Sequence, residues 1–222
     1  MQRTRARKAR SRTVGRPSTQ SDADIRSALM SAAKELFLKH GFAKVTARQI
    51  AAAAHTTPAM IHYYFENKVG LFRAMLQEAI EPFGRILSTA VAAGNGAPPA
   101  DLAALIGGHV RTAVANSWIA TLIVNEVLPE GGQFRAAFVR DIASRLLPML
   151  VELLEHGRKN GTLRSDIDPK LTALSILSLN VFPLISRPIT GPVLGFKLES
   201  DDVERFIAHT TRLLFQGIGA PR

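Results

Sequence analysis

The 222-residue chain contains no cysteine, which excludes disulfides, thiolate metal sites and cysteine nucleophiles. Its six histidines include no pair four residues apart and no His/Glu cluster with metal-ligand spacing. Sustained alternation of apolar and polar residues is also missing, so no strand and no phosphate-binding loop following a strand is predicted. These absences predict an all-α protein that is not an enzyme and holds no metal or cofactor.

Long apolar runs are missing as well. The longest charge-free helical segment, Leu171 to Ser186, contains Asn180, Pro183 and three serines, and a membrane span needs about 20 predominantly apolar residues. We therefore expect a helix buried on most sides and no membrane partner, because a helix that is apolar all round needs cover on more than one face.

Acidic residues are absent from positions 1–20, which carry seven basic side chains; the other 202 residues carry 21 basic and 18 acidic ones. This segment predicts a disordered basic arm. No apolar stretch follows it, which argues against a secretory signal and favours a cytoplasmic protein, although the Arg/Ser composition would also suit a transit peptide. Within it, Gly15-Arg16-Pro17 resembles an AT-hook, in which Arg16 would enter a narrow minor groove. The alternative is a solvated tail that adds nonspecific phosphate attraction.

Two short helices joined by a tight turn are predicted over residues 46–68. Thr46 and Gln49 form a capping box for a helix over 47–54. Thr57 is the next N-cap, and Pro58 occupies the first position of a helix over 58–64. The intervening residues 55–57 match helix-turn-helix spacing, although an ordinary capped helical hairpin would show the same local pattern.

The run I-A-A-A-A-H-T-T-P-A-M-I-H-Y-Y-F-E-N-K-V-G-L-F at 50–72 resembles the signature of the TetR family of bacterial transcriptional regulators. The matching positions are Ile50, Ala51, Ala54, Ile61, Tyr64, Phe65, Lys68, Leu71 and Phe72. Two positions depart from the family pattern. His55 replaces a glycine at a turn position expected to need positive φ, which His tolerates better than most residues, and His62 replaces a tyrosine.

The resemblance implies a DNA-binding surface built on the second motif helix, which would enter the major groove. Arg48 and Lys68 would contact phosphates, residues 58–63 would face base edges, and Tyr64 would hydrogen-bond to the DNA backbone. The full set of expected DNA-binding residues is Arg16, Thr46, Arg48, Thr57, Pro58, Ala59, Met60, His62, Tyr63, Tyr64 and Lys68.

The resemblance also implies three regions: a basic arm at 1–20, a helix-turn-helix domain at 21–66, and a helical ligand-binding and dimerisation domain at 67–222. A first helix is predicted from Ser21 to Gly41, with Ser21 and Asp24 as a capping box. Further helices are predicted over about 67–93, 100–115, 118–128, 134–159, 169–186 and 201–216, with Asn67 and Asp168 as N-caps, Pro82 and Pro148 as bends, and a loop over 94–99. The last two helices would form a homodimer interface, as two half-sites of a palindromic operator in double-stranded DNA require.

Polar or aromatic residues in largely apolar segments are candidates for lining a small-molecule pocket in this domain: His109, Trp118, Asn125, Glu126, Arg140 and Asn180. The alternative for each is a satisfied core or helix-end contact. We expect a repressor released from its operator by a largely apolar effector. An activator, an architectural DNA-binding protein driven by the basic arm and, less favoured, an enzyme with a helical active site remain as alternatives.

Overall fold

The computed structural model describes residues 21–94, 99–132, 134–197 and 199–218 as helices and their connections, with no strand among them. The all-α prediction is therefore confirmed. The basic arm, Arg16 and most of the loop expected at 94–99 lie outside these described residues.

Three helices form the N-terminal unit: α1 (Asp22–His40), α2 (Ala47–Ala53) and α3 (Pro58–Phe65). The caps predicted at Ser21 and Thr46 are present, whereas Thr57 holds the N-cap position of α3 without a side-chain capping hydrogen bond. Ser21 and Asp24 form a capping box on α1, and Thr46 and Gln49 form one on α2. The α2–α3 connection passes through His55, whose φ is 53°, so the expectation of positive φ at this position is confirmed.

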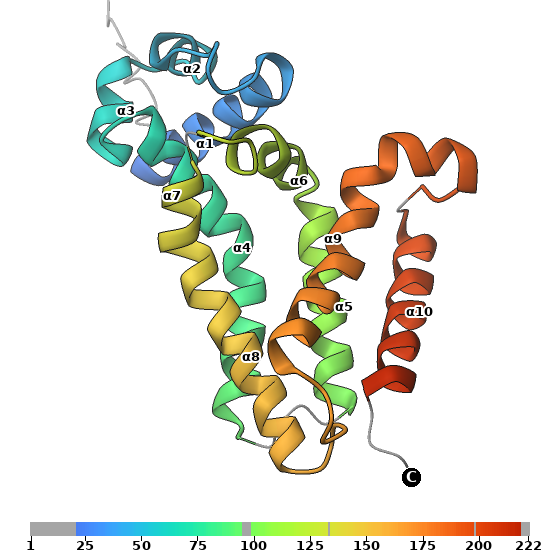
Figure 1. The fold of residues 1–222 in the computed structure, drawn as a ribbon. Helices are drawn as coiled ribbons and strands as arrows, with labels where there is room; N and C mark the ends of the chain where they lie inside the picture. Colours follow the sequence, from blue (N-terminus) through green and yellow to red (C-terminus); the bar gives the residue numbers. More distant parts are fainter. Residues whose placement is uncertain (1–20, 95–98, 133, 198, 219–222) are drawn as a thin grey trace, which may run out of the picture.

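The long helix α4 (Lys68–Ala92) joins this unit to the rest of the chain, and Asn67 caps it by accepting from the Gly70 amide. Beyond it lie α5 (Pro99–Ala115), α8 (Ser144–Lys159), α9 (Pro169–Leu194) and α10 (Ser200–Ile218). Figure 1 shows α4 and α8 running side by side, with α5, α9 and α10 grouped on the other side of the domain.

Two segments predicted as plain helices contain π turns. The first consists of α6 (Trp118–Leu122) continued by η1 (Ile123–Val127). The second consists of α7 (Arg135–Phe138), η2 (Val139–Ala143) and α8, which together span the predicted 134–159 helix. A π turn places one extra residue in a turn and shifts the side chains that follow it, and such turns occur frequently at functional sites.

Helix α9 differs from its prediction. Its N-cap Asp168 and first residue Pro169 are as expected, but it is not buried on most sides within one chain. Leu171, Leu174 and Phe182 are each at least 60% exposed. This 26-residue helix is the one described helix that is long and apolar enough to cross a membrane by length and composition alone. The apolar sequence of α9 indicated that other helices should pack against most of its surface. In the described part of the chain, most of that surface is not packed against another helix.

We predict that Gly70→Ala destabilises the protein by about 3 kcal/mol and displaces α3, because a Cβ at Gly70 would overlap the carbonyl oxygen of Phe65. Thermal unfolding measures the loss. Gly217→Ala, in α10 with open space around the glycine, is the control and should be neutral or stabilising by up to about 1 kcal/mol. Equal stability of the two variants would contradict the packing described at the α3–α4 junction.

A candidate DNA-binding surface and a ligand cavity

The second motif helix, α3, is held from behind by apolar contacts. Its Ile61 and Phe65 are buried, as are Ile50 and Ala51 of α2, and these side chains pack on the core shared by α1 and α4. Figure 1 shows α2 and α3 at the end of the molecule away from the α8–α9 connection. The opposite face of α3 is therefore directed away from the core.

Most residues expected to contact DNA lie on that outer face. Arg48, Thr57, Pro58, Ala59, His62 and Tyr63 are exposed, and Met60 is half-buried. Tyr63 keeps 72% of its surface exposed. Thr57 stands at the N-cap position but its hydroxyl makes no capping hydrogen bond, so it is free to donate to a phosphate. Thr46 is exposed, although its hydroxyl is engaged in the α2 capping box.

His62, the departure from the family pattern, is fixed by its own helix end. Its Nδ1 lies 2.7 Å from the carbonyl oxygen of Glu66, a residue with φ of 65°. A carbonyl can only accept, so Nδ1 carries the proton. With the proton on Nδ1, the neutral form of the ring has Nε2 as its acceptor. His62 is thus suited to accept a hydrogen bond from a base amino group, which the arginine or lysine of many DNA contacts cannot do.

Two expected DNA contacts are directed elsewhere. The Tyr64 hydroxyl donates to Asp22 Oδ1 at 3.0 Å and so ties α3 to the first turn of α1. The Lys68 ammonium donates to the carbonyl oxygens of Phe42 and Val45 at 2.9 and 2.6 Å, and lies 4.1 Å from the centre of the Phe42 ring. Desolvation of this half-buried ammonium lowers the pKa of Lys68, whereas nearby Glu126 acts to raise it. In this structure Lys68 holds the α1–α2 connection rather than pointing outward toward a phosphate.

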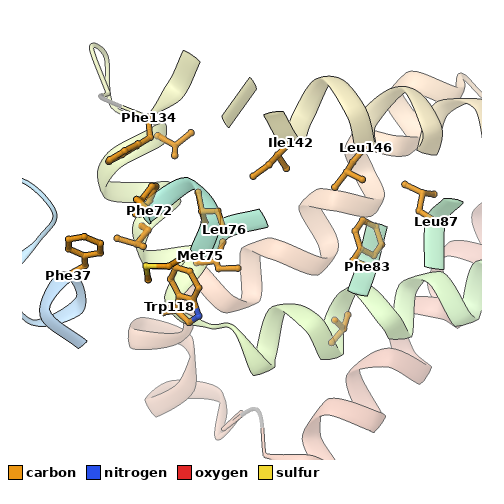
Figure 2. Close-up of a cluster of buried hydrophobic side chains, with 14 of the residues drawn as sticks. Phe37, Phe72, Met75, Leu76, Phe83, Leu87, Trp118, Phe134, Ile142 and Leu146 are labelled. Atoms are coloured by element: carbon orange, nitrogen blue, oxygen red, sulfur yellow. The ribbon is translucent and has the colours of Figure 1, made fainter. Parts of the chain in front are cut away.

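Aromatic rings join this unit to the larger domain. Phe134, which immediately precedes α7, packs its ring 4.0 Å from that of Phe72 in α4 and 4.3 Å from that of Phe42. Figure 2 shows Phe72 and Phe134 beside one another at one end of the buried cluster, with Phe83 and Leu146 at the other end. The Phe134 amide donates to the carbonyl oxygen of Glu126 in η1, so this ring is anchored to both π-containing segments.

A cavity of about 830 Å³ opens in the larger domain between α4, α5, α8, α9 and α10, and this volume is typical of small-molecule sites. Its walls are mostly apolar. They include Phe83 of α4, Leu146 and Leu150 of α8, Leu177 of α9 and Leu213 of α10. Both π segments reach it, through Ile123 of η1 and Ile142 of η2.

Of the six expected pocket residues, His109 alone is among the residues that line this cavity. Trp118 is buried but faces a separate groove near α1, and its Nε1 donates to Asn116 Oδ1 at 3.3 Å. Asn125 is exposed and Arg140 pairs with Asp141 at 2.7 Å. Glu126 lies near Lys68, and Asn180 is buried with neither amide atom hydrogen-bonded.

The sequence did not single out the apolar lining, because leucines and phenylalanines at helical spacing look the same whether they border a cavity or a packed core. The polar stripe on α5 was detectable in principle. His109, Thr112 and Asn116 recur at intervals of three and four, and all three line the cavity. Among the residues that the structure describes, no three His, Asp or Glu side chains gather as a metal site would require.

His109 has an unusual environment for a titratable group. Its ring packs 4.7 Å from that of Phe83, and its Nδ1 is shielded from solvent without a hydrogen-bond partner among the described residues. Burial lowers the pKa of His109 to about 4, so the ring is neutral at pH 7. Because the pKa of His109 is lower in the folded chain, the unfolded chain takes up a proton first as the pH drops. The free energy of unfolding therefore decreases between about pH 6.5 and pH 4.

Comparison with known proteins places both parts of this architecture in one family. Residues 29–75 match the profile described as "Bacterial regulatory proteins, tetR family", and residues 98–212 match "Tetracyclin repressor-like, C-terminal domain". The second match alone spans more than half of the chain.

Individual relatives are similar to this chain in sequence or in fold. The transcriptional repressor BepR of Brucella suis is 23% identical over 161 residues, covering 71% of this chain and 77% of its own. SmeT, the repressor of the Stenotrophomonas maltophilia multidrug efflux pump SmeDEF, superposes with a TM-score of 0.67 at 20% identity over 88% and 92% of the two chains. FadR from Bacillus subtilis, solved in complex with stearoyl-CoA, gives 0.68 at 19% identity over 86% and 98%.

The inward position of Lys68 leads to a prediction that distinguishes a positioning role for this side chain from a phosphate contact. Lys68→Met removes the ammonium donor from the Phe42 and Val45 carbonyl oxygens, of which Phe42 keeps the Val45 amide as a donor, so we expect a loss of about 2 kcal/mol in stability and weaker DNA binding through displaced α2 and α3. The slope of log K against log salt should stay unchanged, because no phosphate contact is lost. Arg48→Met, at an exposed position, is the matched control and should reduce that slope by about 1. A reduced slope for Lys68→Met would contradict the positioning role.

Proposed function

The chain belongs to the TetR family of bacterial regulatory proteins, and from that membership we propose that this ligand-responsive DNA-binding regulator is a dimeric repressor of a palindromic operator. The observation that carries the DNA-binding part is the outer face of α3, where exposed polar and aromatic side chains stand on a helix fixed by buried contacts at its back. The family members matched are transcription regulators. We place this one in the cytoplasm, where the chromosome is.

In this proposal α3 enters a major groove. Tyr63 and His62 reach base edges, Pro58, Ala59 and Met60 form the apolar surface between them, and the Thr57 hydroxyl donates to a phosphate near the helix start. Arg48, on the outer side of α2, takes a second phosphate, and Thr46 lies beside it at the α2 N-terminus. Residues 21–66 form the DNA-binding unit, and the basic segment 1–20 with Arg16 adds affinity through an adjacent minor groove.

Dimerisation would use the exposed apolar stripe of α9. Leu171, Leu174, Phe182, Ile189 and Val193 recur along one side of this helix, and each is at least 60% exposed in the single chain. Contiguous exposed apolar surface of this kind marks an interaction site. Leu213 of α10, 48% exposed, would extend the surface. A twofold copy of this face then buries α9 and α10 in a four-helix bundle, and sets two copies of α3 for two half-sites.

Effector binding would act through the junction at Phe134. Occupancy of the cavity bears on Ile123 in η1 and Ile142 in η2, the two π turns that flank Phe134. A shift of this ring against Phe42 and Phe72 changes the connection that Lys68 holds, and with it the setting of α2 and α3. An effector that prefers the shifted arrangement lowers the affinity for DNA by the same coupling free energy.

A largely apolar effector suits this cavity because its walls are mostly aliphatic and aromatic. The molecules bound to two structural neighbours support an apolar effector: FadR from Bacillus subtilis is solved with stearoyl-CoA, and SmeT is solved with triclosan. Both molecules carry a large apolar part.

The operator proposal is tested by selection of bound duplexes from a random-sequence library at two salt concentrations. We expect the full chain to recover a short palindrome, and a chain without residues 1–20 to recover the same palindrome with lower affinity and a smaller salt slope. Tyr63→Ala should bind it about 10-fold more weakly. Binding without sequence preference, or binding that disappears with the arm, would favour an architectural DNA-binding protein instead.

The dimer proposal is tested by Leu174→Glu, which places a charge in the middle of the α9 stripe. Sedimentation should show a dimer for the natural chain and a monomer for the variant, since burying two unpaired carboxylates costs more than a dimer interface of this size supplies. Val139→Glu, at an exposed apolar position on η2, is the matched control and should remain dimeric. A dimeric Leu174→Glu chain would place the interface elsewhere.

A further inference from the structure

The cavity walls contain no carboxylate, ammonium or guanidinium group. No Asp, Glu, Lys or Arg is among the residues that line it, and its titratable side chains are His109 and His209. A charged group moved from water into such surroundings loses its hydration and gains no counter-charge in return. The part of a ligand that lies inside this cavity is therefore uncharged.

Three of the polar residues that line the cavity, His109, Thr112 and Asn116, lie on one face of α5 and its C-terminal end, and the other three are Ser178 of α9 and His209 and Thr210 of α10. Asn116 is already engaged: its amide nitrogen donates to the carbonyl oxygens of Thr112 and Ala79, and its Oδ1 accepts from Trp118. His109, two helical turns earlier, has a buried Nδ1 with no hydrogen-bond partner among the described residues. Its closest ring neighbour is Phe83, which offers no hydrogen bond.

An imidazole left unpaired among apolar side chains lowers stability, because it has given up hydrogen bonds with water and gained none in the protein. Leucine or phenylalanine would fill the same place without that cost. A neutral imidazole offers one donor and one acceptor. It can therefore pair with a hydroxyl in either direction, and with a carbonyl through its N–H.

We propose that His109 is the polar anchor of the effector site, and that it selects an uncharged, largely apolar molecule carrying a hydroxyl or carbonyl group over the corresponding carboxylate or ammonium. This inference rests on the proposed effector function of the cavity and adds to it the chemical class of the ligand. The neutral state of the ring at pH 7 agrees with it, because burial lowers the pKa of His109 to about 4 and the ring therefore carries no positive charge that would attract a carboxylate.

The test uses the full chain and three probes with one ten-carbon body: 1-decanol, decanoate and decylammonium. The chain contains a single tryptophan, Trp118, and its neighbours Ile119 and Ala120 line the cavity, so tryptophan fluorescence reports binding. Two variants separate the chemistry. His109→Leu removes the hydrogen-bonding group, and His109→Gln keeps a neutral donor and acceptor.

His156→Leu is the matched control. His156 also has a shielded Nδ1 without a partner, but it is not among the residues that line the cavity. We expect 1-decanol to bind the natural chain at least about 10-fold more tightly than the two charged probes. His109→Leu should lose about 10-fold in 1-decanol affinity, while His109→Gln and His156→Leu should stay within about 3-fold of the natural chain.

Thermal unfolding provides a second readout that does not depend on a ligand. His109→Leu should raise Tm by about 2–4 °C, because it removes an unpaired polar group, and this also shows that the variant folds. Three results would each contradict the anchor role of His109: equal affinities for decanoate and 1-decanol, an unchanged 1-decanol affinity in His109→Leu, or no binding of any probe. Operator binding by the same preparations is measured in parallel, so loss of the anchor is distinguished from loss of the DNA-binding function.

Discussion

The DNA-binding surface depends on two helices that cannot stand alone. At seven and eight residues, α2 and α3 are far below the length at which an isolated helix is stable in water. Their positions are set by what they pack against: Ile50, Ile61 and Phe65 are buried, and the Lys68 ammonium satisfies two carbonyl oxygens of the connection before α2. Because packing sets the position of α3, any shift in that packing moves the surface that reads DNA.

This dependence provides a route by which a cavity beside the middle of α4, at Ile80 and Phe83, can influence α3 at the N-terminal end of that helix. Phe134 belongs to the ligand-binding domain by sequence, yet its ring packs on Phe42 and Phe72, against which the DNA-binding unit is built. The π turns on either side of it contribute Ile123 and Ile142 to the cavity wall. A difference of about 1–3 kcal/mol between two arrangements of such a junction is enough for the coupling typical of regulators.

The features that could be predicted from the sequence are those formed by residues close together in the chain. The caps at Ser21, Thr46, Asn67 and Asp168 each involve residues no more than three positions apart, and the structure shows all four. The direction of Lys68 could not be read, since its partners lie 23 and 26 residues away. The same limit applies to the pocket. Trp118 and His109 look alike as isolated polar or aromatic residues on apolar helices, and only the tertiary arrangement turns one of them toward the cavity. For α9, the sequence indicated that the helix needs cover, and the expected homodimer interface on the last two helices names a second chain as its source, but which side chains stay exposed in one chain could be read only from the structure.

The ring of Phe134 also bears on how such regulators can diversify by recombination. The profile of the DNA-binding unit matches residues 29–75, but the hydrophobic core of that unit is completed by Phe134, about 60 positions later. A chimera joined at the sequence boundary would expose Phe42 and Phe72 unless the incoming domain carried a ring at the matching place. The unit that can be exchanged between relatives is therefore discontinuous: the first helices together with the segment around Phe134.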